Sequence, residues 1–253
     1  VRGCFKLVLA NERLLKLNIG ILCLHILLMS TFVALPGELE GVGFPASEHW
    51  KLYLCTMVIS FVAVVPFIIY AEVKRKMKRV FVGCVAVLVV AEVILWGAGG
   101  GFWERVAGVQ LFFLAFNLME ALLPSLISKE SPAGYKGTAM GIYSTSQFIG
   151  VAIGGAFGGW VDGLFDSQTV FLAGALLAMV WLLVASSMKE PRYVSSLRVE
   201  IPEDVEITDA LKQRLEATEG VSEVLIAPQE RSAYVKIDSK MTNRFEVEQA
   251  IKA

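Results

Sequence analysis

The sequence predicts an α-helical membrane protein with six transmembrane helices, followed by a small α+β domain. Two observations support this fold class. The chain has 253 residues, of which 55% are hydrophobic, and its mean hydropathy of +0.61 is too high for an ordinary soluble domain. The apolar residues concentrate in residues 1–194, whereas residues 195–253 are acidic, with 8 Lys/Arg against 12 Asp/Glu. We therefore expect a membrane domain at 1–194 and a soluble domain at 195–253.

Six runs in the first part are long enough to cross a bilayer as helices, which takes about 20 mostly apolar residues. We expect spans at residues 14–36, 50–71, 80–97, 104–128, 137–161 and 168–188. The first run has the full length of a span, so it does not resemble a cleavable signal peptide. Because the chain begins at Val1 rather than Met, we expect either a fragment of a longer protein or an unusual start.

Lysine and arginine are distributed unequally between the two sides of these spans. The loops 37–49, 98–103 and 162–167 contain neither residue, whereas the opposite loops and both terminal segments do. The positive-inside rule then predicts that both termini are cytoplasmic. The densest basic run comprises Lys74, Arg75, Lys76, Lys78 and Arg79. We interpret it first as a topology anchor, with gating or the binding of lipid headgroups as the alternative.

Three spans carry polar residues on a single helical face, counted at 100° per residue. The stripes are Asn18, His25, Met29, Phe32 and Pro36 in the first span; Gln110, Asn117, Glu120, Pro124 and Ser128 in the fourth; and Met140, Ser144, Gln147, Gly154 and Gly158 in the fifth. Such faces usually look toward a cavity or a partner helix. The third and sixth spans are almost wholly apolar, so we expect them to face lipid, with Glu92 snorkelling or forming a local pair.

The fifth span also contains two rows of glycines at four-residue intervals. The rows are Gly150, Gly154 and Gly158, and Gly155, Gly159 and Gly163. Glycine at this spacing allows two helix backbones to approach closely. We expect tight helix packing, with a sliding surface in a moving transporter as the alternative.

Glu120 is an ionisable residue inside an apolar run, FNLMEALLPSL. A charge at the bilayer centre costs about 2.5–3.5 kcal/mol on insertion scales, which makes Glu120 a candidate proton carrier. We expect Asn117, one turn earlier, to hydrogen-bond the carboxyl group, and Pro124, which lacks an N–H, to leave the carbonyl of Glu120 without its helical donor. The alternative is that Glu120 pairs with a polar group and only holds helices together. His25 is either a second titrating group or a packing histidine, and Gln147 contacts either substrate or a neighbouring helix.

The C-terminal residues predict the order β-α-β-β-α. Alternating apolar residues predict strands in SLRVEIP, VSEVLIA and SAYVKID. The stretch TDALKQRLEATEG predicts a helix with Thr208 as its N-cap and Gly220 as its stop, and Asn243 with Glu246 predicts the start of a last helix at 244–252. This order lacks only the fourth strand of the ferredoxin-like pattern.

The stretch GVSEVLIAPQERSAYVKID resembles the second and third strands of heavy-metal-associated domains. Those domains bind soft metals through a Cys-x-x-Cys pair after the first strand, where this chain reads PEDVEITD. The four cysteines, Cys4, Cys23, Cys55 and Cys84, are scattered through the first part and have no metal-ligand spacing. We therefore expect no metal site and no cofactor, and a regulatory, protein-binding or stabilising role for the domain.

A wider resemblance is carried by LLKLNIGILCLHILLMSTFVALPG, FIIYAEVKRKMKRV, FNLMEALLPSLISKESPAGYKGTAMGIYSTSQFIG and the cysteine-free tail. These stretches resemble the C-terminal half of a bacterial inner-membrane transporter of the major facilitator superfamily, of the drug/proton antiporter type. The resemblance implies half of a major facilitator fold, in which the first, second, fourth and fifth spans line a central cavity. It places EVKRKMKR at a degenerate gating loop that lacks the Gly and the Asp-Arg pair of the family motif.

The resemblance implies proton-coupled efflux of small molecules or drugs rather than enzymatic catalysis. The candidate substrate- or proton-binding residues are Glu120, Asn117, Gln147, His25 and Gln110. The expected partners are the lipid bilayer, a small-molecule substrate, protons, and either a missing N-terminal six-helix half or a second copy. The alternative is a membrane-anchored sensor or protein-binding module without transport activity. A metal transporter is disfavoured by the absent Cys pair, and nucleic-acid binding by the lack of a basic stripe beside stacking aromatics.

Overall fold

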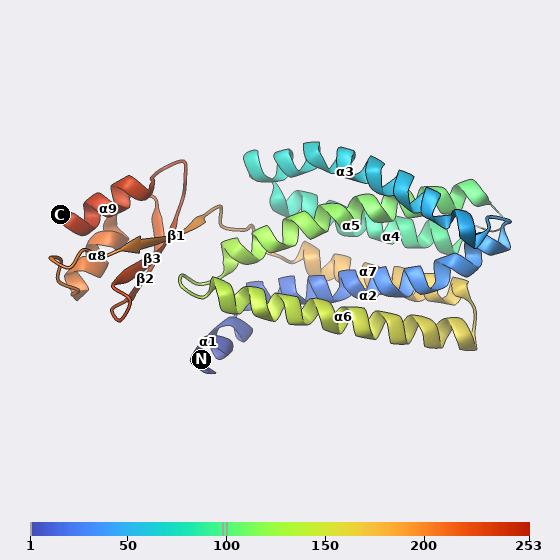
Figure 1. The fold of residues 1–253 in the computed structure, drawn as a ribbon, viewed down its shortest axis with the longest axis horizontal. Coiled ribbons are helices and arrows are strands. Elements are labelled where there is room, and N and C mark those ends of the chain that lie inside the picture. The colour runs from blue at the N-terminus through green and yellow to red at the C-terminus, as the bar shows by residue number, and fades with distance from the viewer. Residues whose placement is uncertain (1, 98, 100) are drawn as a thin grey trace. The chain divides into compact units, whose positions relative to one another are not determined.

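The structure is a computed structural model that describes residues 2–97, 99 and 101–253, with side chains from Phe5 onward. Helices form at all six predicted spans: α2 (Glu12–Gly41), α3 (His49–Val73), α4 (Met77–Trp96), α5 (Phe102–Glu130), α6 (Lys136–Leu164) and α7 (Ser167–Ser186) (Figure 1). A short helix, α1 (Arg2–Leu9), precedes them, and the 3-10 turn η1 (Ala46–Glu48) leads into α3. The predicted helices are therefore confirmed.

Five of these helices are long and apolar enough to cross a membrane, within the part of the chain that the structure describes. The exception is α6, which has 29 residues but contains many Gly, Ser and Thr that lower its hydropathy. The membrane crossing of α6 stays a prediction.

The chain divides into two compact units. One contains residues 15–124 and 142–190, and the other contains residues 1–14, 125–141 and 191–253. The second unit therefore combines the C-terminal domain with the segment that joins α5 to α6. The functional boundary after residue 194 stays a prediction.

In the helical unit, two helices pack most closely where one of them carries glycine. A Cβ atom on Gly154 of α6 would lie only 2.6 Å from the carbonyl oxygen of Ile26 in α2, and Gly150 and Gly158 approach α2 in the same way. The second glycine row faces open space, since nothing lies within 4 Å of such an atom on Gly155. Tight packing is thus confirmed for one of the two rows, and its partner is α2, which runs beside α6 in Figure 1.

The third and sixth spans, which were predicted to face lipid, are each buried on one face and exposed on the other. The helices α4 and α7 pack along each other, with the rings of Phe81 and Trp181 in a T-shaped contact at 6.1 Å. Glu92 of α4 is fully buried rather than lipid-facing, and its Oε1 accepts a hydrogen bond of 2.5 Å from Thr31 of α2. The prediction that Glu92 snorkels was therefore wrong, because a carboxyl group in hydrocarbon is more stable when a neighbouring helix supplies a donor; the local pair is confirmed.

The C-terminal domain has the predicted element order: β1 (Ser195–Glu200), α8 (Asp209–Ala217), β2 (Val221–Ala227), β3 (Ser232–Ile237) and α9 (Arg244–Lys252). The sheet order is β1-β3-β2 with both pairs antiparallel, as in a ferredoxin-like fold without its fourth strand. The Thr208 side chain accepts from the backbone N–H of Leu211, and Asn243 accepts from that of Glu246, so both predicted N-caps form. Apolar residues from the sheet, α8 and α9 make one core.

The segment between α5 and α6 contacts this sheet through buried polar groups. The Lys236 ammonium of β3 donates to the carbonyl oxygens of Ser128 (2.5 Å) and Lys129 (3.2 Å), at the C-terminal end of α5. Glu223 of β2 accepts a 3.0 Å hydrogen bond from the backbone N–H of Ala133. A positive charge at the C-terminal end of a helix is favourable, since the last carbonyl groups point toward it.

Candidate functional site

The two titratable residues of the predicted polar stripes meet between α2 and α5. His25 Nε2 of α2 lies 3.2 Å from Glu120 Oε1 of α5. The distance is that of an ion pair, but the atoms are not aligned as a hydrogen bond, and Glu120 Oε1 has no hydrogen-bond partner among the described residues. The imidazole side chain is 4% exposed and the carboxylate side chain 34% exposed. Glu120 is therefore the member of the pair that solvent or a ligand reaches.

The backbone of α2 orients the histidine ring. His25 Nδ1 lies 3.2 Å from the carbonyl oxygen of Ile21, one helical turn earlier. A carbonyl oxygen only accepts hydrogen bonds, so Nδ1 carries the proton, and Nε2 is the nitrogen that faces Glu120. In the neutral imidazole Nε2 is then an acceptor, and protonation at Nε2 gives an imidazolium beside the carboxylate.

An aromatic side chain lies beside the pair. Phe116 of α5 lies with its ring 5.6 Å from the His25 ring in an edge-on arrangement. Tyr143 of α6 is also buried, at 4% exposure. An aromatic ring of α5 therefore packs against the imidazole of the pair.

The other polar residues of the α5 stripe contact α3. Gln110 Nε2 donates to the backbone oxygen of Thr56 (3.2 Å) and to Ser60 Oγ (3.0 Å). Asn117 Nδ2 lies 3.1 Å from Met57 Sδ. The expected hydrogen bond between Asn117 and Glu120 was therefore wrong, because Asn117 is directed to α3 while Glu120 is directed to α2. The inward orientation of the stripe toward partner helices is confirmed.

The remaining predicted residues lie apart from the pair. Gln147 of α6 is half-buried and forms no hydrogen bond within the described part of the chain, so its role stays a prediction. The basic run Lys74, Arg75, Lys76, Lys78 and Arg79 joins α3 to α4. Arg75 has a left-handed φ of 55°, and the N–H of Lys76 donates to the carbonyl of Ala71, which is the geometry of a helix C-terminal Schellman turn. The gating role of this loop stays a prediction.

Sequence reasoning missed which helices the acidic groups would bridge. The ion pair between Arg105 Nη2 and Glu38 Oε2, at 2.6 Å, joins α5 to α2 at the end of the helical unit far from Glu120, and no motif indicated it.

The sequence did contain a signal for the pairing of His25 with Glu120. His25 lies 13 residues from the start of α2 and Glu120 lies 10 residues from the end of α5, so the two depths differ by only about 4.5 Å of helical rise.

No cluster of three or more His, Cys, Asp or Glu side chains with metal-binding geometry occurs among the described residues. Cys23, Cys55 and Cys84 are free thiols, and the side chain of Cys4 lies outside the described part. The site is therefore described by its titratable pair and its polar contacts alone.

Comparison with known proteins gives one relative that matches the whole chain and others that match part of it. The inner membrane transport protein YajR of Escherichia coli (strain K12) is 73% identical over 252 residues, which cover 100% of this chain and 56% of YajR. An uncharacterized transporter of Buchnera aphidicola subsp. Baizongia pistaciae (strain Bp) is 30% identical over 181 residues, covering 70% of this chain and 46% of that protein. The chain thus spans about half the length of these relatives.

The soluble domain also matches a family model. Residues 197–253 match the YajR YAM domain, and this range contains most of β1 and all of α8, β2, β3 and α9. The chain is therefore similar over its whole length to the C-terminal part of YajR, and its C-terminal domain is similar to the YajR YAM domain.

Proposed function

We propose that the chain is the C-terminal half of a proton-coupled efflux transporter of the major facilitator superfamily in a bacterial inner membrane. The observation that carries the proposal is the pairing of His25 and Glu120 at 3.2 Å, inside apolar helices. The similarity to YajR, an inner membrane transport protein, supports the transporter class. The helices α2, α3, α5 and α6 form one wall of the transport cavity, and the missing half or a second copy forms the other.

Proton coupling follows from the chemistry of the pair. Glu120 and His25 Nε2 together hold one proton either on the carboxyl oxygen or on the imidazole nitrogen. Loss of that proton leaves a carboxylate that is one-third exposed and able to bind a cationic group. Return of the proton removes the negative charge and releases the cation. Competition between a proton and a cation for Glu120 is the minimum that proton-driven exchange requires.

The proposal is tested by transport with and without the carboxylate. The chain is produced in cells lacking YajR, together with the part of YajR that this chain does not match, and ethidium efflux is followed with and without a protonophore. We expect protonophore-sensitive efflux from the paired chains and its loss in Glu120→Gln, because the amide holds no exchangeable acid proton. Glu104→Gln, an exposed position on the same helix, is the matched control and keeps efflux.

Further arms of the experiment separate the other possibilities. Efflux by the chain alone would show that a second copy replaces the other half. Unchanged protonophore-sensitive efflux in Glu120→Gln, at equal membrane abundance, would contradict the proton-carrier role. Absence of efflux of any tested cation from every combination would favour the membrane-anchored sensor, in which the helices hold the YAM-type domain at the membrane.

A further inference from the structure

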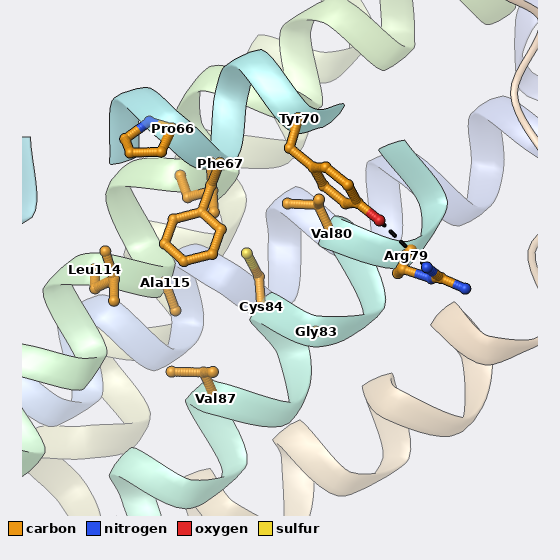
Figure 2. A pocket seen from close by; sticks show the side chains of 11 residues that line it. Pro66, Phe67, Tyr70, Arg79, Val80, Gly83, Cys84, Val87, Leu114 and Ala115 are labelled. Atoms are coloured by element: carbon orange, nitrogen blue, oxygen red, sulfur yellow. Dashed lines mark hydrogen bonds between the residues drawn. The ribbon is translucent and has the colours of Figure 1, made fainter. Parts of the chain in front are cut away.

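A cavity in the helical unit lies apart from the proposed proton site. It lies between α3, α4 and α5 and has a volume of about 440 Å³. Figure 2 shows Phe67 of α3, Val87 of α4 and Leu114 of α5 around it, with Tyr70 and Arg79 at one side. Apart from Tyr70 and Arg79, its lining is apolar or small.

Small residues explain why the three helices leave this space open. Gly83 of α4 has nothing within 4 Å of the position where a Cβ atom would be, and Ala115 of α5 also lines the cavity. On α3, Pro66 has no N–H, so the helix forms one hydrogen bond fewer beside the cavity. The cavity opens outward rather than into a sealed core, because Gly83 and Phe67 are both exposed. It is therefore a built pocket on the outer surface of three apolar helices.

The polar side of the cavity is cationic. Arg79 Nη1 donates a 3.2 Å hydrogen bond to the Tyr70 hydroxyl group, which joins the start of α4 to the end of α3. A guanidinium group has five N–H donors, so this contact leaves others for an anion. Lys74, Lys76 and Lys78 belong to the same basic run, at the edge of the bilayer that the positive-inside rule predicts to be cytoplasmic.

We propose that this cavity binds an anionic phospholipid, with an acyl chain between α3, α4 and α5 and the phosphate on Arg79 and Tyr70. The two ends of the site match the two ends of such a lipid. An apolar chamber that opens to hydrocarbon favours an acyl chain, and a basic pocket between helices at the cytoplasmic surface favours an acidic headgroup. The carboxylate-free lining offers no counter-charge for a cationic drug. The site is independent of the proposed transport function.

The test is native mass spectrometry of the purified chain in detergent, titrated with phosphatidylglycerol or with phosphatidylethanolamine. We expect one retained phosphatidylglycerol and an affinity about fivefold higher than for phosphatidylethanolamine, the order of magnitude for one basic side chain at a membrane surface. Arg79→Gln should abolish this preference. Lys51→Gln, which removes a basic residue at the opposite end of α3, is the matched control and should keep it.

A second variant tests the chamber itself. Gly83→Leu places a side chain in the cavity from a position with open space around it, so the helices can keep their packing, and we expect retention of both lipids to fall. Equal loss of preference in Lys51→Gln, or unchanged retention in Gly83→Leu, would overturn the proposal. Competition by inorganic phosphate at the concentration of the lipid would instead identify a simple anion site, and a dimer in place of the lipid adduct would identify a second copy as the occupant.

Discussion

At the scale of single residues, the two acids of the apolar helices differ in their surroundings. Glu92 is fully buried against Thr31 and next to Gly174, which is consistent with a structural role. Glu120 is one-third exposed and faces His25. The backbone carbonyl of Ile21, in the same helix as His25, orients the imidazole ring. The sequence predicts that both acids are unusual, but it predicts neither partner, because partner choice depends on how the helices rotate against each other. Depth along the helix was the only partial signal.

Lys236 lies in β3, outside the membrane-spanning helices, and its burial predicts a pH dependence of stability. The pKa of Lys236 is lowered from 10.5 to about 8, chiefly by burial and also by the neighbouring Arg192 and Lys136, while Glu223 and Glu130 act in the opposite direction. At a pH between these two pKa values, Lys236 is more protonated in the unfolded chain than in the folded chain. The free energy of unfolding therefore rises with pH across this window. We expect Lys236→Met to remove this rise and Lys240→Met, an exposed lysine of the same domain, to keep it.

Methyl NMR of the chain in detergent measures this effect through Val235 and Ile237, which lie beside Lys236 in the core of the domain. The urea midpoint of these signals should increase between about pH 8 and pH 10 in the unsubstituted chain, following the sign above. A midpoint that falls over this range, or that rises equally in Lys236→Met, would show that Lys236 is not the group responsible.

At the scale of elements, the positions of helices and strands follow from composition, and their contacts do not. The six helices and the order β-α-β-β-α were predictable because apolar runs, alternation and N-caps are local properties of the chain. Which glycine row of α6 meets a neighbour is not local. Gly154 and Gly155 are adjacent in the sequence and share the same sequence neighbours. Only Gly154 lies against the backbone of α2.

This difference gives a matched pair of variants. Gly154→Ala puts a methyl group 2.6 Å from the carbonyl oxygen of Ile26, so α2 and α6 must separate. We expect a loss of stability of roughly 1–3 kcal/mol, the usual range for overpacking. Gly155→Ala should be neutral or stabilising by up to about 1 kcal/mol, since alanine favours helix and the position is open. Thermal unfolding of the purified chain in detergent, followed by tryptophan fluorescence, distinguishes the two; equal destabilisation would contradict the assigned packing face.

At the scale of the whole molecule, the chain contains two compact units. The helical unit holds the His25–Glu120 pair and the cavity between α3, α4 and α5. The second unit joins the YAM-type domain to the connector between α5 and α6 through Lys236 and Glu223. The sequence predicted the elements of the C-terminal domain, but a hydrogen bond between residues 108 positions apart has no local signal.

The measurement that tests the central claim most directly is proton release on substrate binding. Ethidium is added to the chain paired with the complementary part of YajR in weakly buffered detergent solution, and a soluble pH indicator reports the protons set free. Competition for one carboxyl group predicts proton release in the unsubstituted chain and in Glu104→Gln, and none in Glu120→Gln. Equal proton release in Glu120→Gln, at equal ethidium binding, would contradict the assignment of Glu120 as the proton site.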